Sequence, residues 1–291
     1  KRMVNNMLTI LIDADNVAGS SAFAADVARL KAWVKASPPI VPGGEVLLPG
    51  GLEAFLAHLA ADGYRGVNVT VPFKGSAWQS AAEPSTEVVA TGVANTLLLG
   101  PTGPSHAFNT DFSGFKWAYG RRFGSEPPGT VALLGAGGVG TATAAALCDL
   151  GATALRIFDI VPDRSQALAR LLKDRDGGVD IGVAVSAEDA VDGVDGLVNG
   201  TPVGMHWNPG TPVAPSAVGG QRWIFDAIYS PIETPLMVRA AAAGLERLTG
   251  FDLFLGQAID AFEIFTGHSL DPPVLADLEA RLGLLERRRG V

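Results

Sequence analysis

The sequence predicts an α/β protein in two parts, of which the second is a doubly wound parallel sheet. Three observations support this fold class. From residue 130 onward, short apolar runs alternate with helical patterns, as in βα units. The 291 residues are 47% hydrophobic and 18% charged and include 36 Gly, which is typical of a globular chain with many tight turns. A cluster of Pro and Gly at residues 125–129 indicates a linker between the parts.

The first part also alternates between strand and helix patterns. We expect strands at residues 8–12 and 66–71, the latter ending before Pro72, and helices at 22–34 and 52–62. The stretch 37–51 is rich in Pro and Gly and is expected to be loop and short strand. This order favours βα units in one sheet.

The second part is more regular. We expect strands at residues 130–134, 154–158, 182–185, 196–199 and 223–227, with helices at 138–150 and 164–172. From about residue 251 the pattern is helical again and has no strand of its own, so we expect this end to pack back onto the first part.

Charge and cysteine content restrict the class of protein. The net charge of −8 argues against nucleic acid and anionic membranes as partners, although a few local basic groups can still bind a small anion. Cys148 is the single cysteine, which excludes an intramolecular disulfide and a multi-cysteine metal site and fits a reducing cytoplasm. The four histidines lack metal-ligand spacing, so no metal site is predicted.

No segment predicts membrane insertion or secretion. Apolar runs stay well short of the roughly 20 residues that span a bilayer. The polar start at residues 1–6 and the short apolar stretch that ends at Asp13 do not match a secretory leader. We therefore expect a soluble, cytoplasmic protein.

Residues 135–140 supply G-x-G-x-x-G directly after a predicted strand and before a predicted helix. Gly135 permits a tight turn, Gly137 lets the backbone approach a pyrophosphate, and Gly140 permits close packing of helix on strand. Gly138 and Val139 open the helix, whose N-terminal N–H groups can bind the anion. The motif predicts a dinucleotide site in a Rossmann-type domain.

Asp159 bears on the choice of dinucleotide. It ends the second strand of this domain, close to the expected distance of about 20 residues beyond the motif. A carboxylate there accepts hydrogen bonds from a ribose 2′-hydroxyl and repels a 2′-phosphate. Asp159 could also be an ordinary strand-end acid, and Arg164, five positions on, could attract a 2′-phosphate. We expect NAD rather than NADP.

Other dehydrogenase chemistries are excluded by their missing residues. None of the three tyrosines is followed four positions later by lysine, and a single cysteine cannot build a two-cysteine catalytic zinc site. No G-x-x-x-x-G-K-[ST] motif is present. A lysine or a carboxylate is left as the acid–base candidate.

Seven segments in order resemble the shikimate/quinate dehydrogenase family, over about residues 66–267. They are N-V-T-V-P-F-K at 68–74, G-V-A-N-T at 92–96, N-T-D at 109–111, the glycine loop at 135–140, N-G-T-P-V-G-M at 199–205, D-A-I-Y-S-P at 226–231 with Thr234, and Gly250 followed by G-Q-A at 256–258 and A-F-E at 261–263. Taken singly, each polar residue in them could be an ordinary turn or surface residue. Seven such segments in the order found in the family favour the functional interpretation of these residues.

The resemblance implies a role for each position. The catalytic pair would be Lys74 and Asp111. Thr70, Asn95 and Gln257 would bind the substrate's ring hydroxyls, and Tyr229 would lie at the same pocket. Thr201, Met205 and Gly250 would belong to the cofactor site, with Met205 and Gly250 beside the nicotinamide. It further implies a substrate domain of residues 1–112 completed by helices in 251–291, a Rossmann domain of 113–250, and an active site in the cleft between them. The reaction would be hydride transfer between NAD and a ring hydroxyl of shikimate, quinate or a close analogue.

The acid–base role within the pair stays open. Oxidation of a secondary alcohol needs a proton acceptor within hydrogen-bond reach of the oxygen. Burial of Lys74 favours its neutral, basic form, whereas an ionised Asp111 beside it favours the ammonium. We assign the pair jointly.

The N-terminal turn departs from the family pattern. The family's Ser-x-Ser-Pro turn, whose hydroxyls bind the substrate carboxylate, aligns here with Ser20, while Ala22 and Phe23 replace the second serine and the proline. One lost hydroxyl bond to a charged acceptor is worth roughly 1.5–3 kcal/mol. Ser21 could compensate, or the substrate differs from shikimate. The change motivates an alternative, a non-catalytic sensor of dinucleotide and polyol acid; a monomer and a homodimer are both compatible with the sequence.

Overall fold

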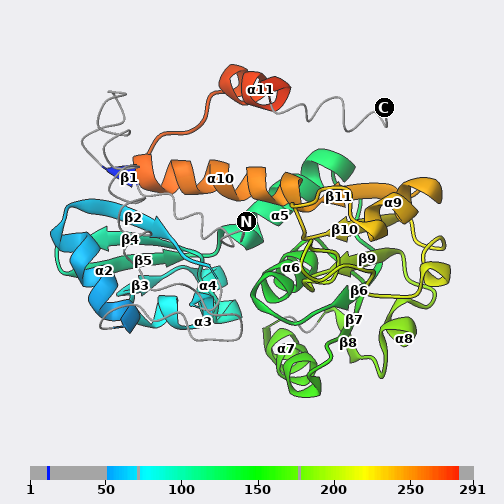
Figure 1. The fold of residues 1–291 in the computed structure, drawn as a ribbon. Helices are drawn as coiled ribbons and strands as arrows, with labels where there is room; N and C mark the ends of the chain where they lie inside the picture. Colours follow the sequence, from blue (N-terminus) through cyan, green and yellow to red (C-terminus); the bar gives the residue numbers. More distant parts are fainter. Residues whose placement is uncertain (1–11, 14–50, 71–72, 176–177, 282–291) are drawn as a thin grey trace.

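The computed structural model describes residues 12–13, 51–70, 73–175 and 178–281. They form two sheets side by side, each with its own helices, and one long helix, α10 (Gly250–Thr266), runs past both (Figure 1). The expected helix at 22–34, most of the expected strand at 8–12, and Ser20 lie outside the described residues.

The six-stranded sheet is parallel throughout, in the order β11-β10-β9-β6-β7-β8. Its strands are β6 (Thr130–Leu134), β7 (Ala154–Phe158), β8 (Asp180–Val183), β9 (Gly196–Asn199), β10 (Trp223–Asp226) and β11 (Glu246–Thr249). The strand order reverses between β6 and β9, and ligands of doubly wound sheets bind at such a reversal, beyond the carboxyl ends of the strands. The predicted doubly wound sheet is confirmed.

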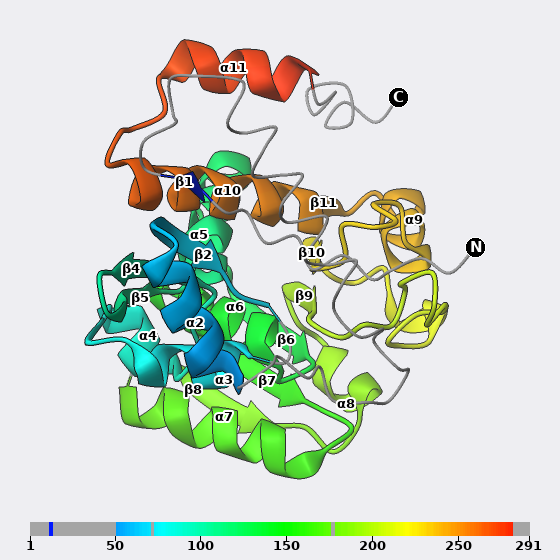
Figure 2. The same ribbon diagram turned by 60° about the vertical axis from the view of Figure 1, so that its left-hand side comes forward.

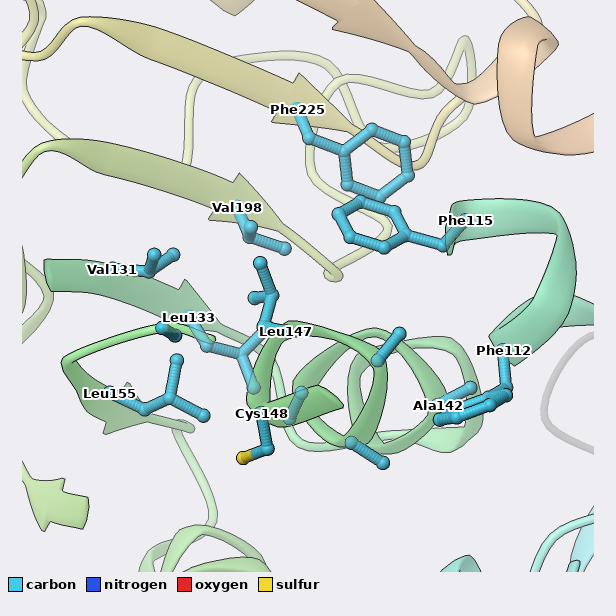
Figure 3. Packing of buried hydrophobic residues seen from close by; sticks show 14 of the residues in the cluster. Phe112, Phe115, Val131, Leu133, Ala142, Leu147, Cys148, Leu155, Val198 and Phe225 are labelled. Atoms are coloured by element: carbon cyan, nitrogen blue, oxygen red, sulfur yellow. The ribbon is translucent and has the colours of Figure 1, made fainter. Parts of the chain in front are cut away.

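Helices cover both faces of this sheet. They are α6 (Gly138–Asp149), α7 (Pro162–Arg175), α8 (Ala187–Val191) and α9 (Pro235–Ala242). Figure 3 shows the core on one face, where Leu147 and Cys148 of α6 pack among Val131, Leu133 and Leu155. Cys148 is buried in this core. The packing fixes the start of α6, and therefore the glycine loop, against β6.

The five-stranded sheet is mixed, in the order β1-β2-β4-β5-β3. Its strands are β1 (Ile12–Asp13), β2 (Tyr64–Asn68), β3 (Glu83–Pro84), β4 (Thr96–Gly100) and β5 (Gly103–Phe108). The helices around it are α2 (Gly51–Ala61), α3 (Lys74–Ala77) and α4 (Thr86–Thr91). β2, β4 and β5 pair antiparallel. We did not predict the β4–β5 hairpin, although its turn is Gly100-Pro101-Thr102-Gly103 and Gly103 has a φ of +137°.

Two predicted strands begin two residues earlier than expected. β2 begins at Tyr64 rather than Gly66, and β8 spans 180–183 rather than 182–185. In β8 the added residues are Asp180, which is exposed at the edge of the sheet and pairs with Ala154, and Ile181, which is buried and pairs with Leu155. Our prediction weighted apolar residues and therefore excluded Asp180, which an edge strand accommodates without burial. This reason does not apply to the buried Ile181 or to β2, which lies inside its sheet.

The C-terminal helix α10 joins the two halves. It packs beside α5 (Thr110–Phe123), the helix that links β5 to β6, as both views show (Figures 1 and 2). It also reaches the first sheet, where a Cβ at Gly66 would lie 2.3 Å from the ring of Phe265. The last described helix, α11 (Pro272–Arg281), lies on the outer side of α10, and its Leu275 packs against Leu255 and Ile259.

Candidate active site

Lys74 and Asp111 meet although 37 positions separate them. The Nζ atom of Lys74, the first residue of α3, donates a hydrogen bond to Oδ2 of Asp111 in the first turn of α5. Their side chains are only 15% and 4% exposed. The contact that the sequence interpretation required is present, and the catalytic role of the pair stays a prediction.

The first turn of α5 holds Asp111 in place. The helix is capped by Asn109, whose Oδ1 accepts from the N–H of Phe112 at 3.3 Å. A carboxylate at this end of a helix is also favoured by the helix dipole. The backbone carbonyl of Lys74 accepts from the N–H of Ala94 at 2.9 Å, which ties the start of α3 to the segment before β4. Both partners therefore lie on ordered backbone.

Asn95 is buried beside the pair and is already hydrogen-bonded within the protein. Its Oδ1 accepts from the N–H of Thr110 at 2.7 Å and from the Thr110 hydroxyl at 3.0 Å. Its Nδ2 donates to Oε1 of Gln257 at 3.3 Å. Because Oδ1 is committed to Thr110, the amide NH₂ is the group of Asn95 that is suited to a ligand oxygen.

Gln257 reaches this cluster because α10 crosses α5 very closely. A Cβ at Gly114 would lie 2.6 Å from the backbone N of Gln257, and one at Gly256 would lie 2.7 Å from the Gly114 carbonyl oxygen. Only glycine permits this approach of two backbones. This crossing was not predicted: Gly256 lies in the G-Q-A segment that resembles the family, but no role was expected for it, and the only signal for Gly114 is a glycine inside a helix.

Thr70 follows β2 and precedes Lys74 in the same motif. Its carbonyl oxygen accepts from the N–H of Phe73, the residue before α3, at 2.9 Å. Its side chain is partly exposed. This places Thr70 on the same segment as the catalytic candidate Lys74.

The glycine loop has the geometry that its motif predicts. Gly135 has a φ of +93°. A Cβ at Gly140 would lie 2.0 Å from the carbonyl oxygen of Gly135, so the start of α6 packs directly on the turn. No heavy atom of the described residues lies within 4 Å of a Cβ built at Gly137, which leaves open space beside the backbone. The loop fits an approaching pyrophosphate.

The loop also touches the catalytic candidates. A Cβ at Gly138 would lie 3.4 Å from Cδ of Lys74 and 3.7 Å from Cγ1 of Val93. Val139 is the next residue of α6, in the same helical turn. The first turn of α6 therefore lies against the stem of Lys74, and the two halves of the predicted site are adjacent.

Asp159 and Arg164 lie where the sequence analysis expected them. Asp159 follows β7 directly, and its carboxylate accepts from the N–H groups of Ala136 and Val161, each at 2.8 Å. The bond to Ala136 ties Asp159 to the glycine loop. Arg164 lies in the first turn of α7 and is exposed.

The remaining predicted residues lie on three segments near the carboxyl ends of β9 and β10. Thr201 bonds Asn199, and Met205 forms an isolated bridge with Asn208. Gly250 begins α10, where a Cβ would lie 2.4 Å from the carbonyl oxygen of Ala227. Tyr229 is 44% exposed.

Relatives of known activity match most of the chain. The quinate/shikimate dehydrogenase (NAD(+)) of Corynebacterium glutamicum is 37% identical over 227 residues, which cover 76% of this chain and 78% of that protein. The chain belongs to the shikimate/quinate dehydrogenase family. No protein-family model matches it.

Solved structures of family members share the fold. Quinate dehydrogenase from Corynebacterium glutamicum in complex with NAD has a TM-score of 0.72 and 35% identity, covering 80% of this chain and 83% of that chain. Shikimate 5-dehydrogenase from Thermus thermophilus in complex with NADP(H) and shikimate has a TM-score of 0.67 and 30% identity, covering 81% and 85%. The predicted family and its fold, an α/β part beside a Rossmann-type part, are confirmed.

Two further findings concern other classes of site. Within the described part of the chain, no three His, Cys, Asp or Glu side chains gather in a way that could hold a metal ion. Among the described residues, no helix is long and apolar enough to cross a membrane.

Proposed function

We propose that this member of the shikimate/quinate dehydrogenase family transfers a hydride between NAD and a ring hydroxyl or ketone of shikimate, quinate or a close analogue. The observation that carries the proposal is the hydrogen-bonded pair of Lys74 and Asp111, whose lysine stem lies against the first turn of α6. An acid–base pair thus adjoins the loop that fits a dinucleotide.

The pair supplies the proton transfer of the reaction. In the oxidation, carbon loses a hydride and the hydroxyl oxygen loses a proton. The nicotinamide ring, when bound, takes up the hydride. Lys74 or Asp111 accepts the proton at Nζ or at a carboxylate oxygen, and the hydrogen bond between them lets the pair share it. Their burial excludes bulk water from the proton acceptor.

The substrate side of the site would be built from Thr70, Asn95 and Gln257. Asn95 and Gln257 are hydrogen-bonded to each other, and Asn95 is held by Thr110, one residue before Asp111. Ring hydroxyls bound by these groups would keep the reacting carbon at a fixed distance from the pair. Tyr229 would border the same pocket, and Ser20 would contact the substrate carboxylate.

The cofactor side would be built from the glycine loop, Asp159 and the segments with Thr201, Met205 and Gly250. The carboxylate of Asp159 would accept bonds from the ribose and repel a 2′-phosphate, so NAD is preferred. The solved relative from Corynebacterium glutamicum is in complex with NAD and the Thermus structure holds NADP(H), so relatives of both cofactor classes occur and the choice of NAD rests on Asp159. Arg164 would lie near the ribose.

We also propose the wider organisation expected from the sequence. Residues 1–112 with the helices of 251–291 would form the substrate domain, residues 113–250 the dinucleotide domain, and the cleft between them the active site. The partner would be a cyclic polyol carboxylate. The protein would act in the cytoplasm as a monomer or a homodimer.

A nicotinamide absorbance assay against a panel of cyclic polyol acids tests this function. We expect turnover of at least one compound with NAD, and its loss in Lys74→Ala. Lys116→Ala is the matched control. Like Lys74, Lys116 donates to a carboxylate, with 3.1 Å between its Nζ and Oδ2 of Asp149, but this pair is exposed and lies away from the proposed site. Binding by calorimetry without turnover of any compound would favour the sensor and overturn the dehydrogenase.

A further inference from the structure

A second buried carboxylate, outside the acid–base pair, lies at the carboxyl edge of the six-stranded sheet. Asp226 is the last residue of β10 and lies in register with Asn199, the last residue of β9. Both are fully buried, as is Thr234. The hydride-transfer chemistry uses none of the three.

Asp226 holds both ends of the segment 227–234. Its Oδ1 accepts from the backbone N–H of Ile228 at 3.1 Å. Its Oδ2 accepts from the hydroxyl of Thr234 at 2.6 Å. Thr234 in turn caps α9 by accepting from the N–H of Met237 at 3.2 Å. The segment that carries Tyr229 is therefore closed over one carboxylate.

Through Asn199, Asp226 also holds the neighbouring loop. The Nδ2 of Asn199 donates to Oδ1 of Asp226 at 3.0 Å and to the carbonyl of Val203 at 3.1 Å. Its Oδ1 accepts from the N–H and the hydroxyl of Thr201, at 3.0 and 2.7 Å. This loop continues to Met205, on the proposed cofactor side.

The two loops and the start of α10 are in contact. A Cβ at Gly204 would lie 3.0 Å from Cδ1 of Ile228 and 3.4 Å from Cβ of Thr234. The ring of Tyr229 stacks on Phe254 of α10, with 5.4 Å between the ring centroids. A shift of segment 227–234 would therefore displace both the loop with Gly204 and the start of α10.

Stability is a poor reason for a carboxylate at this position. Burial raises the pKa of Asp226 to about 6, and the hydrogen bonds from Thr234, Ile228 and Asn199 only partly offset that effect. An ionised carboxylate that is buried and bonded only to neutral donors opposes folding. The hydrogen bonds from those donors nevertheless hold the surrounding backbone in one geometry.

We propose that Asp226 is a positioning residue, which sets the placement of the loop with Thr201 and Met205 relative to the segment with Tyr229. The inference rests on the proposed function, in which these residues belong to the cofactor and substrate sides. Asp226 touches neither reactant and acts through Asn199 and Thr234.

The first test compares Asp226→Asn with Asp195→Asn. Asp195 directly precedes β9, at the amino ends of the parallel strands, whereas Asp226 lies at their carboxyl ends. Oδ2 of Asp195 accepts from the N–H of Thr130 at 2.8 Å. We expect Asp226→Asn to lower kcat of the folded enzyme by about ten- to a hundredfold, as small misplacements of reacting groups do. Asp195→Asn should lower the thermal midpoint and leave kcat unchanged. An unchanged kcat in Asp226→Asn would overturn the proposal.

A second pair of variants decides the case if Asp226→Asn does not fold. Thr234→Val removes the hydroxyl that donates to Asp226, and Thr234→Ser keeps it. We expect kcat to fall in the valine variant and to be restored in the serine variant. A lower thermal midpoint with unchanged kcat in Thr234→Val would show a purely structural role and overturn the proposal.

Calorimetry with NAD separates failure of this inference from failure of the proposed function. If the wild-type protein turns over no polyol acid, the dehydrogenase proposal fails, and NAD affinity becomes the readout. Weaker NAD binding in Asp226→Asn and Thr234→Val, but not in Asp195→Asn, would still support the positioning role. Equal affinity in all of them would overturn it.

Discussion

The glycine loop and the acid–base cluster lie against each other but are built in opposite ways. The loop is one short segment, residues 135–140, whose shape depends on the absence of side chains. The cluster is assembled from α3, the residue before β4, α5 and α10, and its partners Asn95 and Gln257 are 162 positions apart. An added methyl group should damage the loop directly, whereas the cluster should fail when its helices shift.

Among the glycine substitutions, the largest effect is expected in the loop. A Cβ at Gly140 would meet the Gly135 carbonyl at 2.0 Å, so Gly140→Ala must move backbone. We expect its unfolding free energy to fall by about 1–3 kcal/mol and NAD binding to weaken with it. Denaturant unfolding and calorimetry measure the two quantities.

Gly137→Ala is the matched control within the same loop, because a Cβ there meets no described atom. It should keep the unfolding free energy and lose NAD affinity, since the methyl group fills the space left for the pyrophosphate. If both variants lost stability equally, or neither lost NAD affinity, the glycine loop would not be the pyrophosphate site.

The next effect concerns the helix crossing. A Cβ at Gly256 would lie 2.7 Å from the Gly114 carbonyl, so Gly256→Ala should push α10 away from α5 and carry Gln257 with it. We expect kcat/KM for the polyol acid to fall by about tenfold or more, with NAD affinity retained. Steady-state kinetics measure this difference between the two ligands.

Gly120→Ala is its control, in α5 where a Cβ meets no described atom. It should preserve activity and stabilise the helix by up to about 1 kcal/mol. Unchanged kinetics in Gly256→Ala would show that the cluster tolerates the displacement.

A smaller effect follows from the buried carboxylate of Asp226 at the carboxyl end of β10. The pKa of Asp226 is about 6 when folded, against 3.8 for the ordinary group. Between pH 3.8 and about 6 the folded state therefore binds more protons than the unfolded state. The contribution of Asp226 to the unfolding free energy is fully present below pH 3.8 and is lost as the pH rises through about 6. Asp226→Asn lacks this loss, so its unfolding free energy relative to wild type should rise by about 2 kcal/mol between about pH 4.5 and 7.5. A pH-independent difference would contradict the assignment.

The smallest effect is expected in cofactor choice. Asp159→Asn removes the charge that repels a 2′-phosphate, and we expect the preference for NAD over NADP to fall by about tenfold. Asp163→Asn, an exposed acid at the start of α7, is the control and should leave the preference unchanged. A wild-type preference for NADP would refute the charge argument.

How far the sequence could predict these regions follows from the same contrast. β6 and the glycine loop were predictable because a strand, a turn and a helix start obey local rules, and β6 matches residue for residue. The meeting of Lys74 with Asp111 across 37 positions is not encoded in any periodicity, and only the resemblance to a family suggested it. Asp226 and Gly256 lie in segments that resemble the family, but the resemblance gave neither of them a role, and Gly114 lies in no such segment. A glycine in a helix and an acid at a strand end are both common, so the helix crossing and the hydrogen bonds of Asp226 could not be predicted.

A double-mutant cycle on Lys74 and Asp111 tests the central claim most directly, with kcat followed by nicotinamide absorbance. Because the two groups act as one unit, Lys74→Ala and Asp111→Ala should each lower kcat by about 10²–10⁴-fold, and the double variant no further than the worse single one. NAD affinity should stay at the wild-type value in all three. Wild-type turnover in either single variant, or losses that multiply in full in the double variant, would contradict the account.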